Sequence, residues 1–113
     1  MIESYSFGSI QIDGKSYTSD LMVGPKWVES NWWRKSGHSL CEEDLEAIFL
    51  RDIDILVVGT GSSGMMTIPE KTVSLMKSRG IALEADKTGM AVRKFNQYLR
   101  EGRKVAGAFH LTC

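Results

Sequence analysis

One stretch decides the fold: Ile53-Asp54-Ile55-Leu56-Val57-Val58-Gly59-Thr60-Gly61-Ser62-Ser63-Gly64, residues 53–64. Its first half is a short apolar run that ends at glycines, which predicts a strand buried on both faces. Its second half spells G-x-G-x-x-G, the spacing of a dinucleotide-binding loop. Residues 59–64 therefore either bind a ligand or simply turn the chain at the end of a strand.

The position of the next helix weakens the dinucleotide interpretation. A dinucleotide loop requires a helix that begins at once, so that its N-terminus faces the phosphates. Here Thr67-Ile68-Pro69-Glu70 has the pattern of a capping box with proline in the first turn. A helix begun at Gly61 would enclose Pro69, which costs about 3 kcal/mol. Residues 59–66 thus form a long loop, and a plain turn, a dinucleotide site and a pocket for another anion or small ligand all stay open.

Beyond this loop, helices and strands alternate. We expect a helix that ends before Gly80, a strand over residues 81–85, a helix capped by Thr88 and ended by Gly102, and a strand over residues 104–111. The resulting β-α-β-α-β order implies crossover connections between parallel strands.

The first third is predicted to be antiparallel β. Apolar and polar residues alternate from Tyr5 to Ile12, Asp13-Gly14 is a hairpin turn, and residues 15–18 form the return strand. Leu21-Met22-Val23 predicts a further short strand. The fold class is therefore α/β, with an antiparallel β section ahead of the alternating part.

Residues 26–38 fit neither period, and we expect an irregular segment with a short strand near residues 32–35. A helix is then predicted to start at Ser39, whose hydroxyl would form a capping box with Glu42. Its apolar face would comprise Cys41, Leu45, Ile48 and Phe49.

Size and charge exclude several classes of protein. The 113 residues suffice for one domain, residues 1–113, with its own core. Fourteen basic residues balance fourteen acidic ones, which disfavours a nucleic-acid binder and a polybasic membrane anchor. No apolar run is long enough to span a membrane, and residues 1–6 lack the features of a secretory signal. We expect a cytoplasmic protein.

Histidines and cysteines form a second near-motif. His38-Ser39-Leu40-Cys41 and His110-Leu111-Thr112-Cys113 are both H-x-x-C, and together they contain every histidine and cysteine of the chain. Four such ligands could hold zinc, but residues i and i+3 of a strand point to opposite faces. Acidic neighbours oppose a Cys41 thiolate, and no serine lies in a nucleophile-elbow pattern. We therefore predict no metal and no cofactor, and we assign no catalytic residue.

A tryptophan-rich segment gives the best candidate for a binding surface. Trp27, Trp32 and Trp33 lie close to Arg34, Lys35 and His38. Aromatic residues and arginine are enriched at interfaces and in ligand clefts. The alternative is that these rings only cover one face of a small sheet, and we favour it for at least one of them.

Taken together, these motifs resemble the small Mth-type domain family. The match runs from the Trp-Arg segment and its following His-Ser through Leu56–Gly61 to the ending Val105-Ala106-Gly107-Ala108-Phe109-His110-Leu111-Thr112-Cys113. The family is named for a methanogen archaeal protein, for which this chain is itself a candidate, and includes adipogenesis-associated Mth-domain proteins and mitochondrial complex I assembly factor 3. The resemblance implies a three-layer fold with a mixed central sheet, and no established catalytic residue.

Two functions follow as hypotheses. The first is a non-catalytic protein-interaction or assembly-factor module with an unidentified protein partner, so that we lean against an enzyme. The alternative is a small-molecule or anion-binding protein, or an undescribed enzyme, that uses the glycine loop. No nucleic-acid or membrane partner is expected, and homo-oligomerisation stays open. The candidate binding residues are Trp33, Arg34, His38, Gly59, Thr60, Gly61, Ser62 and His110.

Overall fold

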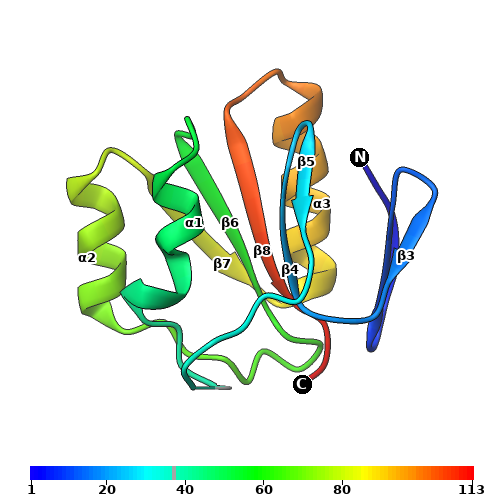
Figure 1. Ribbon diagram of the computed structural model, residues 1–113, viewed down its shortest axis with the longest axis horizontal. Helices are drawn as coiled ribbons and strands as arrows, with labels where there is room; N and C mark the ends of the chain where they lie inside the picture. The colour runs from blue at the N-terminus through cyan, green and yellow to red at the C-terminus, as the bar shows by residue number, and fades with distance from the viewer. Residues whose placement is uncertain (37) are drawn as a thin grey trace.

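A five-stranded mixed sheet forms the centre of the computed structural model, which describes residues 1–36 and 38–113 (Figure 1). Its strands are β4 (Leu21–Gly24), β5 (Trp27–Glu29), β6 (Ile55–Thr60), β7 (Ala82–Asp86) and β8 (Val105–His110). They lie in the order β5-β4-β8-β6-β7. β6 is parallel to β7 and β8, whereas β4 is antiparallel to β8 and β5. β8 therefore joins a parallel half of the sheet to an antiparallel half.

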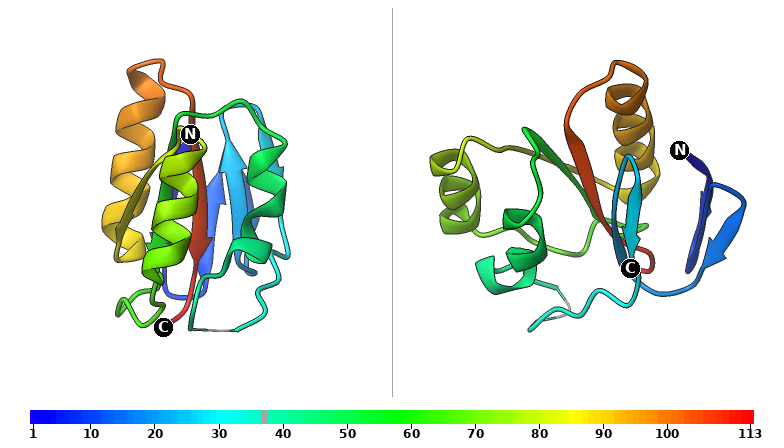
Figure 2. Two further views of the ribbon diagram at one scale, coloured as in Figure 1. Left: turned by 90° about the vertical axis from the view of Figure 1, so that its left-hand side faces the viewer. Right: turned by 45° about the horizontal axis from the view of Figure 1, so that its top comes forward.

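Each face of this sheet is covered by a further layer (Figure 2). One face packs against α3 (Thr88–Arg100) and a small antiparallel sheet of β1 (Ile2–Ser6), β2 (Ser9–Ile12) and β3 (Lys15–Tyr17). The other packs against α2 (Glu70–Ser78), α1 (Glu46–Phe49) and the 3-10 turn η1 (Glu42–Leu45) that leads into α1. The predicted α/β class and the three-layer arrangement with a mixed central sheet are confirmed.

The stretch that decides the fold, β6, is buried on both faces as predicted. Ile55 and Val57 belong to the apolar cluster under α3, whereas Leu56 and Val58 belong to the cluster under α1 and α2. All four side chains are at most 3% exposed. Alternate side chains of one strand thus hold the two outer layers together, which explains the uninterrupted apolar run.

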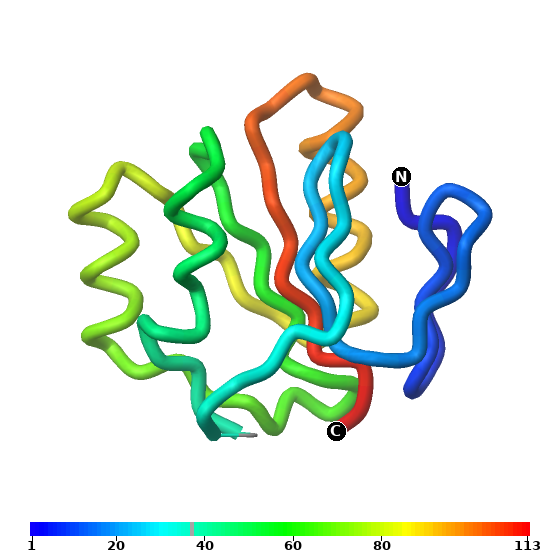
Figure 3. Tube along the Cα trace, viewed as in Figure 1, coloured from blue at the N-terminus to red at the C-terminus, as the bar shows by residue number. Residues whose placement is uncertain are grey.

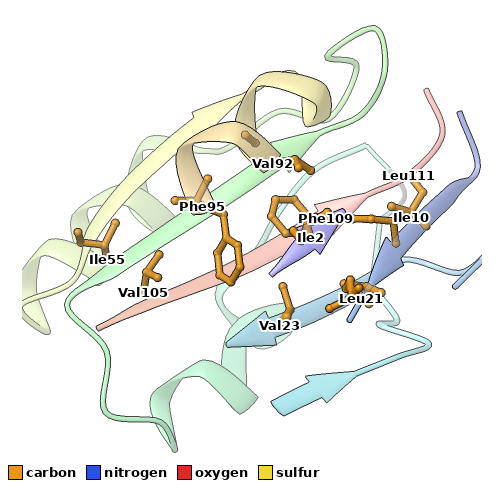
Figure 4. Close-up of a cluster of buried hydrophobic side chains, with 13 residues drawn as sticks. Ile2, Ile10, Leu21, Val23, Ile55, Val92, Phe95, Val105, Phe109 and Leu111 are labelled. Atoms are coloured by element: carbon orange, nitrogen blue, oxygen red, sulfur yellow. The ribbon is translucent and has the colours of Figure 1, made fainter. Parts of the chain in front are cut away.

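Phe109 organises the core on the α3 side (Figure 4). Its ring meets that of Phe95 edge to face, with 6.0 Å between centroids and 88° between planes. Two glycines make room for it: a Cβ on Gly107 would lie 2.5 Å from the Phe109 ring, and one on Gly59 would lie 2.8 Å from it. Glycine is therefore a packing requirement at both positions.

Of two predictions about the N-terminal half, the structure confirms one and contradicts the other. The hairpin turn at Asp13-Gly14 is confirmed, with φ of 48° and 83°. The short strand expected near residues 32–35 is wrong, because the strand is β5, at Trp27–Glu29. Trp27 pairs with Gly24, and its indole occupies the space that a side chain on Gly24 would take. This contact spans only the two-residue turn at residues 25–26 and places the strand directly after that turn.

The expected helix caps are corrected by tertiary contacts. Helical structure begins at Glu42 rather than Ser39, with Cys41 as the cap, and the Asp44 carboxylate accepts from the Cys41 amide at 3.0 Å. Ser39 instead bridges to Thr67. Thr67 does not cap α2, since Pro69 is the capping residue and the Thr67 hydroxyl donates to the His38 carbonyl.

The third expected cap is corrected as well. Lys87 caps α3, and Thr88 is its first helical residue. The Thr88 hydroxyl does not cap the helix, because it donates to the carbonyl of His110 at the carboxyl end of β8.

Gly107→Ala is expected to lower the free energy of unfolding by about 1–3 kcal/mol, because the added methyl group overpacks the Phe109 ring. The control is Gly89→Ala in α3, where nothing lies within 4 Å of an added Cβ. It should leave stability unchanged or raise it by up to about 1 kcal/mol. Urea unfolding of both variants measures the difference, and equal losses would contradict this role of Gly107.

Candidate functional site

Three charged or polar side chains meet at the carboxyl end of β8. Asp20 precedes β4, His110 ends β8, and Arg34 lies in the segment after β5. Asp20 Oδ2 lies 2.7 Å from both Arg34 Nη1 and His110 Nδ1. Asp20 Oδ1 accepts from the Leu111 amide at 2.8 Å. One carboxylate thus connects three separate parts of the chain.

This Asp20–Arg34–His110 cluster is largely withdrawn from water. The Arg34 side chain is 6% exposed, that of His110 9% and that of Asp20 18%. His110 Nδ1 also lies 3.1 Å from Arg34 Nη2, so that whether it donates to Asp20 or accepts from Arg34 depends on the tautomer of the ring. His110 Nε2 is buried without a hydrogen-bond partner among residues 1–36 and 38–113.

The pKa of Asp20 shows which effect dominates in the cluster. Burial favours the neutral acid and by itself would raise this pKa. The hydrogen bonds from the Leu111 amide, His110 and Arg34, together with the Arg34 charge, outweigh burial and lower the pKa of Asp20 below its usual value. Asp20 is therefore held as a carboxylate, and Arg34 is held as its counter-ion.

The cluster fixes the tryptophan-rich segment against the strand ends. Trp32 is 8% exposed, its backbone amide donates to the Asp20 carbonyl, and its indole donates to the Asp44 carbonyl. The Arg34 guanidinium lies 4.9 Å from the centre of the Trp32 ring. Between these two buried residues, Trp33 is 75% exposed. An aromatic side chain in water is thus carried by a backbone that is fixed on both sides.

The glycine loop after β6 is closed by residues of the same chain. The chain after β8 runs alongside it (Figure 3). The Ser62 amide donates to the Thr112 carbonyl at 2.6 Å, and the Met65 amide donates to the Cys113 carbonyl at 3.1 Å. Gly61 has a φ of 107°, and a side chain there would collide with the backbone of Cys113. The glycine at position 61 therefore permits this close backbone contact.

The glycine loop and the Asp20–Arg34–His110 cluster meet at the backbone of His110. The Thr88 hydroxyl donates to the His110 carbonyl at 2.6 Å and accepts from the Gly61 amide at 2.9 Å. Thr60, which pairs with His110 across the sheet, donates to the Asp86 carbonyl. Hydroxyl groups thus connect the ends of β6, β7 and β8, and occupy polar groups that an anion would need.

The candidate binding residues fall into three groups. Arg34 and His110 come together in the buried cluster. Gly59, Thr60 and Gly61 are buried at the end of β6. Trp33, His38 and Ser62 are exposed. Sequence reasoning missed Asp20, the residue at the centre of the cluster. Its one signal was a lone carboxylate placed directly before the apolar run of β4.

The cysteines do not combine with the histidines. The Cys41 thiol donates to Asp44 at 3.2 Å; burial, followed by the hydrogen bonds to Asp44 and Glu43, raises its pKa. Cys113 is exposed and free. In the part of the chain that the structure describes, no three His, Cys, Asp or Glu side chains are grouped to hold a metal ion. Nor does any helix in residues 1–36 and 38–113 have the length and apolar character needed to cross a bilayer.

Comparison with known proteins gives this architecture a family. Residues 2–110 match the family described as "Protein of unknown function (DUF498/DUF598)". The chain is 33% identical over 110 residues to mouse "NADH dehydrogenase (ubiquinone) 1 alpha subcomplex assembly factor 3", which covers 95% of this chain and 57% of the mouse protein. The chain thus spans little more than half the length of that relative.

Solved structures show the same fold. A conserved hypothetical protein from Pyrococcus horikoshii OT3 superposes with a TM-score of 0.84 at 26% identity, covering 100% of this chain and 99% of that one. A Bordetella pertussis protein described as a Mth938-like domain has a TM-score of 0.73 at 21% identity, covering 98% and 85%. The molecule is a three-layer α/β protein of the Mth938-like type. It belongs to the DUF498/DUF598 family.

Asp20→Asn is expected to remove about 3–5 kcal/mol of stability near neutral pH, because the buried Arg34 loses its carboxylate. The lowered pKa also sets a pH dependence: this stability is complete above the unfolded-state pKa, about 3.9, and is lost as the pH falls through the folded-state value. Urea unfolding from neutral to acid pH should therefore bring the wild type towards the variant.

Asp52→Asn is the matched control, since Asp52 pairs with Lys104 at 3.0 Å but is 84% exposed. It should change stability by less than about 1 kcal/mol. A wild-type advantage over Asp20→Asn that stays constant down to the lowest pH would contradict the assignment of Asp20.

Proposed function

We propose that this chain is a non-catalytic, protein-binding module of the assembly-factor type. The observation that carries the proposal is Trp33, a large aromatic side chain that is 75% exposed on a fixed backbone. Interface hot spots are enriched in tryptophan, and a fixed backbone lowers the entropy lost on binding. The name of the mouse relative, an assembly factor, supports a protein partner. A single domain over residues 1–113 and a cytoplasmic location are parts of this proposal.

The proposed binding surface is the Trp33 surface, which comprises Trp33, Lys35, Ser36, His38 and the exposed part of the glycine loop around Ser62. The backbones of these segments are connected, since the Thr67 amide after the loop donates to the His38 carbonyl at 2.7 Å. Arg34 and His110 lie beneath this surface and position it rather than contact the partner. Gly59, Thr60 and Gly61 shape the loop from below. The surface thus has an aromatic centre with polar groups around it, as interfaces commonly do.

Trp33→Ala is expected to weaken binding of the partner by about 30-fold, the loss of a hot-spot residue. The partner is first captured from native extract by a photo-crosslinking amino acid at position 33, and its affinity is then measured with purified protein. Leu50→Ala is the matched control, because Leu50 is also apolar and is 87% exposed. A partner that is crosslinked equally well from position 50, or that binds Trp33→Ala with unchanged affinity, would contradict the proposal.

The second candidate is a small-molecule or anion-binding protein, or an undescribed enzyme, that uses the glycine loop. One observation favours it: His110 Nε2 is buried without a hydrogen-bond partner among the described residues. Another opposes it, since the Ser62 and Met65 amides already donate to the Thr112 and Cys113 carbonyls. An anion in the loop would have to displace residues 112–113, and we therefore rank this function second.

Thermal unfolding with phosphate, nucleotides and small carboxylates distinguishes the two candidates. A ligand at 100 times its Kd should stabilise the fold by about 2.7 kcal/mol. The first candidate predicts no change in melting temperature with any of these compounds. A rise that disappears in Ser62→Pro, which lacks the loop amide, would favour the second.

A further inference from the structure

A groove of about 560 Å³ lies between β1 and the first turns of α3. One wall is the consecutive segment Ile2–Tyr5, and the other is a face of α3. The groove belongs to the small sheet and α3, whereas the Trp33 surface belongs to the segment after β5. It is therefore a separate feature of the molecule.

The open edge of β1 faces this groove. β1 is an edge strand of its sheet. The Ile2 amide donates to Asn96 Oδ1 at 3.0 Å, and the Asn96 amide donates to the Ile2 carbonyl at 2.8 Å. A side chain of α3 thus pairs with the backbone of β1 as a neighbouring strand would. This pairing shows that the outer edge of β1 points towards α3.

Asn96 occupies the backbone groups of Ile2, and the pairing of β1 with β2 leaves those of Tyr5 without a partner strand on the outer edge. Tyr5 pairs with Ile10, and Ile10 pairs on its other side with Tyr17. In antiparallel sheets, a residue that hydrogen-bonds one neighbour directs its backbone groups away from the other. Because Ile12 and Lys15 close the two-residue turn of the next hairpin, Ile10 directs its groups to β3. The amide and carbonyl of Tyr5 therefore point outward, into the groove.

The α3 wall is shaped to admit a further segment. Gly89 lies in the first turn of the helix, with nothing within 4 Å of an added Cβ and no need for positive φ. Glycine lowers helix stability by about 1 kcal/mol relative to alanine. Its effect here is to keep the groove open. Met90, which is 46% exposed, adds a flexible apolar surface beside it.

The groove lining contains one basic and one acidic side chain, Arg93 and Glu3, which do not form an ion pair with each other. Arg93 is exposed and has no ion pair or hydrogen bond within residues 1–36 and 38–113. Glu3 is the one acidic residue of the groove lining, and it binds the turn after β2 instead of Arg93. Its two carboxylate oxygens accept from the Asp13 and Gly14 amides at 3.0 and 2.6 Å. An occupant with an acidic side chain would complement Arg93.

We propose that this groove binds an extended segment of a partner protein, which adds to β1 as a further strand and places an acidic side chain against Arg93. Strand addition derives its affinity from backbone hydrogen bonds, and adjacent side chains give the specificity. Tyr5 supplies the backbone groups, Met90 the apolar contact and Arg93 the charge. This binding mode does not depend on the Trp33 surface.

The experiment uses a phage-displayed library of random linear peptides, selected on the full chain. Selected peptides are expected to carry an acidic residue in an alternating, β-forming sequence. Arg93→Glu should weaken their binding by roughly tenfold or more, since it replaces attraction with repulsion. Gly89→Leu should abolish binding while the protein remains folded, because it fills open space. Arg100→Glu and Gln97→Leu, on other parts of α3, are the matched controls and should bind as the wild type does.

Hydrogen exchange distinguishes strand addition from other modes. The Tyr5 amide is expected to exchange freely in the unbound protein and to become protected when a selected peptide binds. The proposal is overturned if selection yields no peptide that is sensitive to Arg93→Glu and Gly89→Leu, or if the Tyr5 amide stays unprotected in the complex. Trp33→Ala should not alter peptide binding, so that the two proposed surfaces are tested independently.

Discussion

The pairing of β8 with two strands of opposite direction is the constraint on which the rest of the structure depends. β8 is antiparallel to β4 and parallel to β6, and all six of its residues are buried. Its register places Phe109 opposite both Leu21 and Gly59. A slip by one residue would turn Phe109 to the other face of the sheet, where it would replace the small Ala108. Packing on both faces therefore fixes one register.

The polar cluster follows from this register. Because Leu21 pairs with Phe109, the residues beside them, Asp20 and His110, lie next to one another at the same edge of the sheet. Arg34 then completes the cluster from a segment that has no strand of its own. Ion pairs this deeply buried contribute little net stability, since desolvation opposes the attraction between the charges. The role of the cluster is to hold the backbone on both sides of Trp33 in one position.

Local patterns predicted the elements that depend on local physics. The apolar run of β6, the Asp13-Gly14 turn and the helix that ends before Gly102 were all identified, because each needs only near neighbours in the sequence. β5 was placed wrongly although its pairing is equally local: Trp27 faces Gly24 across a two-residue turn, a contact that apolar periodicity does not mark.

The predictions of helix caps were wrong because they considered only neighbouring residues. Serine and threonine hydroxyls favour helix starts, but here Thr67 and Thr88 bind carbonyl groups far away in the sequence, on His38 and His110. The candidate site was predicted in part: Arg34, from the tryptophan-rich segment, and His110, from the second H-x-x-C motif, were among the candidate binding residues. Asp20 was not, because the partners that make it important lie in two distant segments. The resemblance to the Mth-type family supplied the layered arrangement, which the residue patterns left open.

The place of β8 in the chain has a consequence for how the protein is made. During synthesis β4 and β6 leave the ribosome well before β8; β4 can pair with β5 and β6 with β7, but the edge of each strand that faces β8 stays open until β8 arrives. Until then, the apolar segments Leu21–Val23 and Ile55–Val58 present unpaired strand edges to the surrounding solution. Long-range pairing of this kind slows folding and exposes the nascent chain to aggregation.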